Sequence, residues 1–166
     1  MQPFINNSKS KHQQGAAAVE FAIVAMLFFT LLFAILELGR LFYLQNAVQE
    51  VTRRAAREAT VRWVTEEYQA RELALFGASN LPGGAEVTID NISIEYLDVN
   101  RSLISNPPAT PLDNITACLS EEPNCIAFVR AFITNASYIP MVALFSFFSV
   151  PLPASTVTMP AESLGY

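Results

Sequence analysis

The feature that most constrains this chain is a long apolar run near its start. Residues 16–36 form 21 positions with only two polar side chains, Glu20 and Thr30. A helix needs roughly 20 apolar residues to cross about 30 Å of hydrocarbon. The run is longer than the apolar segment of about 7 to 15 residues in a secretory signal peptide, and no A-x-A-like cleavage site follows it. The sequence therefore predicts one membrane-spanning helix.

A carboxylate within that span needs an explanation. A charged group at membrane depth costs at least about 2.5 kcal/mol even on lenient insertion scales, so it usually has a partner and a function. Glu20 is the fifth residue after Gly15, and Gly15 ends a polar head that contains Lys9 and Lys11 but no acid. The head, residues 1–15, is interpreted as a short cytoplasmic leader.

This spacing resembles that of a known family. Residues 15–21, Gly-Ala-Ala-Ala-Val-Glu-Phe, resemble the processing site of type IV prepilin-like proteins. The Ala-Ala-Ala-Val version is most similar to the TadE/TadF-like minor pseudopilins of the tight-adherence (Flp) type IV pilus system. The resemblance implies that a prepilin peptidase cuts after Gly15 and frees the amine of Ala16. It also implies that Glu20 pairs with this amine, in the same or a neighbouring subunit, so that both charges enter the apolar packing together.

The resemblance further implies a location and a set of partners. The protein would be a single-pass protein of the bacterial inner membrane, with its N-terminus in the cytoplasm and its C-terminal domain in the periplasm. It would support initiation or assembly of a pilus through subunit packing. Its partners would be the prepilin peptidase, other pilin and pseudopilin subunits, the inner-membrane assembly machinery and the lipid bilayer. Charge alone leaves the orientation open, because Arg40, Arg53 and Arg54 beyond the span nearly balance Lys9 and Lys11.

Beyond the span, residues 37–76 are predicted to continue the same helix into the periplasm. No proline lies between Pro3 and Pro82. Apolar residues recur at steps of three and four, which is the period of one helix face. This stripe is expected to seat the C-terminal sheet rather than to form a coiled-coil seam. Three acids each precede an arginine by four residues, the favourable order for helix pairs. The stripe includes Val48, Val51 and Ala55, and the pairs are Glu50–Arg54, Glu58–Arg62 and Glu67–Arg71.

Residues 77–166 are predicted to form a small C-terminal β-rich domain. Residues 77–84 contain a proline–glycine turn signal that ends the helix. Residues 86–90 and 92–99 have strand-like patterns, and they form either a hairpin or one long bent strand. Residues 126–133 alternate as a well-covered strand does, and residues 152–159 resemble a final edge strand. The predicted fold class is α+β, with a long transmembrane-to-periplasmic helix (spanning part 16–36, extension 37–76) followed by a small antiparallel sheet.

Two features of this domain have more than one interpretation. Cys118 and Cys125 lie at the end of a long connection, residues 100–124. A disulfide between them would close a small loop and indicate an oxidising compartment, whereas two free thiols would indicate a reducing one. The apolar residues 138–148 either cap the core, which we expect, or expose a patch that would contact a membrane or a partner.

Composition excludes several classes of function. The net charge is −5, and the basic residues are interspersed with acids, so we expect no nucleic-acid binding. The only histidine, His12, lies in the predicted leader. Two cysteines alone make no metal site of the usual four-ligand kind, and no nucleophile-elbow pattern is present. We therefore expect no enzyme activity, no metal and no cofactor. The alternative function is an uncut, single-pass anchored subunit of another cell-envelope complex.

Overall fold

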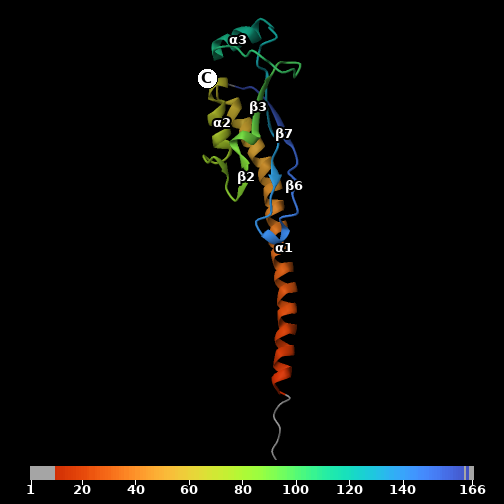
Figure 1. Ribbon diagram of the computed structural model, residues 1–166. Coiled ribbons are helices and arrows are strands. Elements are labelled where there is room, and N and C mark those ends of the chain that lie inside the picture. Colours follow the sequence, from red (N-terminus) through yellow and green to blue (C-terminus); the bar gives the residue numbers. More distant parts are fainter. Residues whose placement is uncertain (1–9, 163, 165–166) are drawn as a thin grey trace, which may run out of the picture. The chain divides into compact units, whose positions relative to one another are not determined.

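The computed structural model describes residues 10–162 and Leu164, so most of the predicted leader lies outside the described residues (Figure 1). The chain divides into two compact units, Met1–Arg40 and Leu41–Tyr166. Helix α1 (Ser10–Thr60) contributes residues to both units. The fold class is α+β, as predicted, because α1 is followed by small antiparallel sheets.

In the first unit, the described residues are helical and carry exposed apolar side chains. Phe21, Met26 and Leu31 are exposed by 74%, 71% and 64%. By length and composition this is a helix that is able to cross a membrane. Leaving so many large apolar side chains in water would be unfavourable, so the surface of this segment suits hydrocarbon.

Helix α1 ends at Thr60, so the prediction of one continuous helix to residue 76 is wrong. The backbone carbonyl of Thr60 accepts a hydrogen bond of 2.9 Å from the backbone N–H of Leu164. The indole Nε1 of Trp63 donates to the carbonyl of Ala109 at 3.2 Å. No glycine or proline marks this end, and contacts with distant residues accompany it. A 3₁₀ turn η1 (Val64–Glu66) then leads to a separate helix α2 (Glu67–Ala74).

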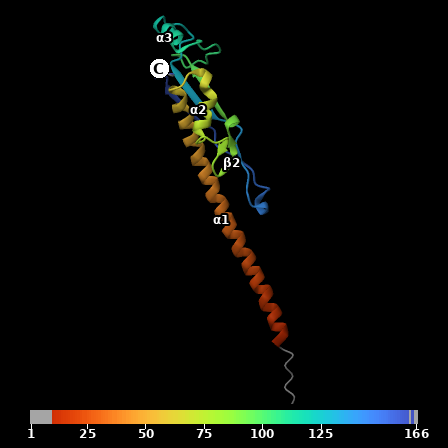
Figure 2. The ribbon, with the colours of Figure 1, turned by 90° about the vertical axis from the view of Figure 1, so that its left-hand side faces the viewer.

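The core of the second unit lies between α1 and a three-stranded sheet. The predicted stripe on α1 is confirmed, because Val48, Val51 and Ala55 are fully buried. The sheet has the order β3-β4-β7, and all its pairs are antiparallel. The two views of Figures 1 and 2 show the sheet running alongside the C-terminal part of α1. The strands are β3 (Ile92–Leu97), β4 (Phe128–Ile133) and β7 (Ser155–Pro160).

Two strand predictions from the pattern are confirmed in this sheet. Strand β4 is the central strand, and Val129, Ala131 and Ile133 on one of its faces are buried. Strand β7 lies at the edge of the sheet. On the other face of the sheet, Glu95 lies directly opposite Arg130, and the two form a cross-strand ion pair. The alternation along β4 therefore reflects one face on the core and one partly covered face.

The two strand-like runs after the turn form neither a hairpin nor one bent strand. Strand β2 (Gly84–Thr88) pairs with β1 (Asn80–Leu81), whereas β3 pairs with β4. A short 3₁₀ turn, η2 (Ile89–Asn91), separates β2 from β3. At Gly84, an added Cβ would clash with a methyl carbon of the buried Leu44 on α1. Glycine at this position therefore allows β2 to approach the helix closely.

The remaining elements lie at the two ends of the sheet. Helix α3 (Pro111–Leu119) occupies the connection for which no structure was predicted. Strands β5 (Ser137–Tyr138) and β6 (Val150–Pro151) pair with each other and flank residues 139–149, which contain the 3₁₀ turn η3 (Ala143–Phe145). Tyr138 is buried, but Met141 and Phe147 are exposed by 77% and 83%. The expectation that this apolar stretch caps the core is therefore wrong beyond Tyr138.

Candidate processing and packing site

Gly15 lies inside helix α1, which begins at Ser10. A Cβ atom added to Gly15 would meet no other atom within 4 Å. Glycine in a helix interior is destabilising by about 0.5–1 kcal/mol relative to alanine. The packing of the described residues therefore gives no reason for a glycine at this position.

Ala16 and Glu20 lie one turn apart on α1, and both are exposed. Residues four apart in a helix lie on the same face, and helix side chains lean toward the N-terminus, so the Glu20 side chain leans toward residue 16. An ammonium group at residue 16 would thus lie within reach of the Glu20 carboxylate of its own chain, or of a neighbouring copy packed against the same face. The structure places the three residues of the predicted site, Gly15, Ala16 and Glu20, within six consecutive residues of one helix.

The polar groups around this site are few. The hydroxyl of Thr30 donates to the carbonyl of Met26 at 2.8 Å, so its hydrogen bond is made within its own helix. Glu20 is the only ionisable side chain between His12 and Glu37. The sequence has two lysines, Lys9 and Lys11, and both precede Gly15, so every basic side chain from residue 16 onward is an arginine.

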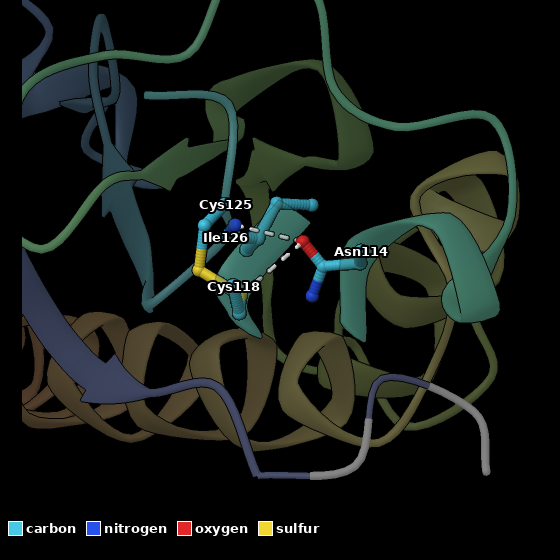
Figure 3. The surroundings of a disulfide bond; sticks show 4 residues. All are labelled: Asn114, Cys118, Cys125 and Ile126. Atoms are coloured by element: carbon cyan, nitrogen blue, oxygen red, sulfur yellow. Dashed lines mark hydrogen bonds between the residues drawn. A yellow bond between two sulfur atoms is a disulfide. The ribbon is translucent and has the colours of Figure 1, made fainter. Parts of the chain in front are cut away.

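The second predicted site is a disulfide in the C-terminal unit, and the structure joins Cys118 to Cys125 (Figure 3). Their Cα atoms are 4.7 Å apart, and the bond closes a loop between α3 and β4. Asn114 lies beside it. The side-chain oxygen of Asn114 accepts a hydrogen bond of 2.8 Å from the backbone N–H of Ile126, as Figure 3 shows. The disulfide and this hydrogen bond together fix α3 to the start of β4.

Sequence reasoning missed α3 and Asn114, although a local signal was present. Thr110 is the N-cap of α3, and its hydroxyl accepts a hydrogen bond of 3.2 Å from the backbone N–H of Asp113. The carboxylate of Asp113 in turn accepts a hydrogen bond of 3.1 Å from the backbone N–H of Thr110, which completes a capping box. Proline at the first helical position, Pro111, is a second start signal. These three residues would have predicted the start of a helix within the long connection.

Several acidic side chains of the C-terminal unit form ion pairs with arginines, and these pairs stabilise the helices. The predicted helix pairs are present, as Glu50–Arg54, Glu58–Arg62 and Glu67–Arg71.

Burial raises the pKa of the Tyr96 hydroxyl above its ordinary value. The nearby Glu67 also raises this pKa, whereas Arg71 lowers it. Tyr96 is therefore neutral at physiological pH. Within residues 10–162 and Leu164, no group of three or more His, Cys, Asp or Glu side chains is placed to hold a metal ion.

Comparisons with known proteins agree with this arrangement. A family model described as TadE-like protein matches residues 15–57, which are 43 of the 166 residues. The match begins at Gly15 and contains the whole apolar span. It bears out the resemblance of residues 15–21 and indicates a membrane-anchored protein related to the Tad pilus. The comparison with curated proteins and that with solved structures found no match.

Proposed function

We propose, from the premise that residues 15–57 are a TadE-like segment, that this chain is a minor pseudopilin of a tight-adherence pilus. A prepilin peptidase cuts it after Gly15. The mature chain stays in the inner membrane through residues 16–36, with its C-terminal unit in the periplasm, and supports pilus assembly by packing against other pilin subunits and the assembly machinery. The protein has no catalytic role of its own. The observation that carries this proposal is a glycine inside a helix that packing does not explain, followed one turn later by a carboxylate.

Gly15 suits a cleavage site for two physical reasons. A peptidase binds its substrate in an extended conformation, so the helix around residue 15 must open before the bond is cut. Glycine lowers the cost of that opening because it is a poor helix former. An added Cβ at Gly15 would also meet nothing within 4 Å, so no described side chain covers this position.

Glu20 suits subunit packing. Cleavage creates an ammonium group at Ala16, at the N-terminus of a helix whose aligned peptide dipoles already place partial positive charge there. The Glu20 carboxylate, one turn away, offsets both the charge of the ammonium group and the partial positive charge of the helix N-terminus. Subunits can then pack their apolar helices side by side in the bilayer, and the two charges enter the interface as a pair rather than singly.

The mature N-terminus tests the proposal. The full chain is expressed in cells with and without a prepilin peptidase, and its intact mass and N-terminal sequence are measured from membranes. With the peptidase the chain begins at Ala16, and without it residues 1–15 are retained. Gly15→Ala blocks the cut, because the added methyl group occupies the position next to the scissile bond.

Gly39→Ala is the matched control, since Gly39 lies in the same helix and also has nothing within 4 Å of an added Cβ. This variant is cut normally. Retention of Met1 in the wild-type chain when the peptidase is active would contradict the pseudopilin assignment, and would favour an uncut anchored subunit of another envelope complex.

A further inference from the structure

We propose that residues 139–149, here called the apolar loop, insert into the surface of the bilayer in which α1 is anchored. The C-terminal unit would then contact the membrane at a second point besides its helix. This inference rests on membrane anchoring by α1 and is independent of cleavage after Gly15. Three properties of the apolar loop support the inference: its position at one end of the C-terminal unit, its composition and its exposure.

The end of α1 marks one end of the C-terminal unit. Trp63, just after α1, donates to the carbonyl of Ala109, which lies next to Thr110, the N-cap of α3. The carbonyl of Thr60 accepts from Leu164, near the C-terminus. Helix α3, the disulfide and the end of α1 therefore lie together. In the sheet, β4 starts at this end with Phe128 and leads away from it.

The apolar loop lies at the opposite end of the same unit. Strand β4 ends at Ile133, and the chain continues through β5 into the loop. Strand β5 contacts β2, whose first residue, Gly84, lies against Leu44. The hydroxyl of Tyr43 donates to the carbonyl of Pro82 at 2.7 Å. Both views show the loop and α3 at opposite ends of the sheet (Figures 1 and 2). The loop is therefore at the end where α1 enters this unit.

Chain connectivity makes this the end of the unit that lies nearest to the apolar span along the chain. The apolar span ends at Leu36, and the C-terminal unit starts five residues later at Leu41. Five residues of helix correspond to a rise of about 7.5 Å. The headgroup regions on the two faces of a bilayer together account for about 10–15 Å of a total thickness of roughly 40–45 Å. The headgroup region on one face is therefore about as thick as this rise. A loop at this end is thus within reach of the interface.

The composition of the loop suits that environment. No charged residue lies between Arg130 and Glu162, so the loop and both its flanking strands are uncharged. Met141, Leu144 and Phe147 are exposed by 77%, 54% and 83%. Aromatic and apolar side chains on such a segment enter the boundary between headgroups and acyl chains, about 5–10 Å deep. Exposed apolar patches of this kind mark contacts with a membrane or a partner, and the position of this one favours the membrane.

The absence of charge also predicts how insertion responds to salt. Basic segments bind anionic lipid through electrostatic attraction, which salt screens over about 10 Å at 0.1 M ionic strength. The apolar loop has no basic side chain, so its insertion depends on apolar burial alone. Insertion should therefore be the same with and without anionic lipid, and unaffected by high salt.

Fluorescence quenching by spin-labelled lipid tests the inference. Phe147→Cys is prepared in the full chain and labelled with a nitrobenzoxadiazole dye, while the native cysteines remain in their disulfide. The protein is reconstituted into vesicles of phosphatidylethanolamine and phosphatidylglycerol that contain lipid with a nitroxide near the headgroup. The label at residue 147 is expected to be quenched several-fold more strongly than a label at Tyr68→Cys. Tyr68 is exposed by 60% and lies on α2, close in sequence to the far end of the unit.

Two further measurements separate the possible outcomes. A label at Leu31→Cys, within the span, reports that α1 is in the bilayer, so a failure of anchoring is distinguished from a failure of the loop to insert. A nitroxide at the end of the acyl chain should quench residue 147 less than one near the headgroup. Equal quenching at residues 147 and 68 would overturn the inference. So would shielding of residue 147 that depends on protein concentration and not on the nitroxide, because the loop would then be covered by a second protein.

Discussion

Glu20 differs from the other acids of this chain in its surroundings. From residue 13 to residue 36 it is the only ionisable side chain, whereas Glu50, Glu58 and Glu67 each have an arginine four residues later. An acid in such isolation raises the cost of membrane residence for a single subunit. The structure does not require it for packing, because Glu20 is exposed on α1. We therefore expect its role to lie in contact with another charged group, which the proposal above identifies as the Ala16 amine.

Glu20→Ala separates anchoring from assembly. The variant should be cut after Gly15 and should remain in the membrane, since the substitution removes the cost of burying a carboxylate. It should fail to co-purify with other pilus subunits, because the Ala16 ammonium would be buried without its partner. Removing one partner of a buried pair costs about 3–5 kcal/mol, which weakens association by about two orders of magnitude or more.

Thr30→Ala is the matched control for that measurement. It removes the other polar side chain of the span, whose hydrogen bond is made to Met26 within the same helix. This variant should co-purify as the wild type does. Normal partner binding by a correctly cut Glu20→Ala protein would show that the charge pair has no role in assembly.

At the scale of elements, the disulfide and α3 together hold the chain in place at the start of the central strand, β4. Cys118→Ser combined with Cys125→Ser should lower the free energy of unfolding of the C-terminal unit by about 2 to 3 kcal/mol, the chain-entropy value for a loop of this size. Denaturant unfolding of the full chain in detergent, followed by circular dichroism, measures the difference.

The wild-type chain with and without a thiol reductant is the control for the double substitution. Reduction should shift its unfolding midpoint to that of the double variant. An unchanged midpoint on reduction would mean that the hydrogen bond from Ile126 to Asn114 holds the loop closed without the disulfide.

The elements that could be predicted from sequence are those whose signal is local. The apolar run and the three–four stripe predict α1, alternation predicts β4 as a covered strand, and residues 152–159 resemble the edge strand that β7 forms. The end of α1 at Thr60 could not be predicted, because it is accompanied by contacts with Ala109 and Leu164, which are far away in sequence. The separation of β2 from β3 likewise depends on which distant strand each one pairs with.

In the candidate site, too, the residues with a local signal could be predicted and those that depend on distant contacts could not. Gly15, Ala16 and Glu20 are adjacent in sequence, so their positions on one helix follow from the prediction of that helix. Asn114 was missed because its role depends on the backbone of Ile126, twelve residues later. The exposure of the apolar loop could not be predicted either, since composition alone does not distinguish an apolar segment that caps a core from one that leaves it.

At the scale of the whole molecule, the orientation in the membrane decides whether the disulfide lies in an oxidising or a reducing compartment. With the C-terminal unit in the periplasm, Tyr68→Cys should react with a membrane-impermeant maleimide in intact spheroplasts as fully as in lysed cells. Mass spectrometry of the purified chain measures the extent of labelling. The wild-type chain should remain unlabelled in both, because its cysteines are joined to each other. Labelling of residue 68 only after lysis would reverse the orientation and place the disulfide in a reducing compartment.

The placement of both lysines before Gly15 has a practical consequence for chemistry on this protein. If the proposed cut after Gly15 removes residues 1–15, the remaining chain has a single primary amine, the N-terminal nitrogen of Ala16. An acylating reagent then has one target per molecule, and that target is the group proposed to pair with Glu20. Under the proposal, this amine would react with the reagent when a subunit is alone and would be protected when the subunit is buried in an assembly.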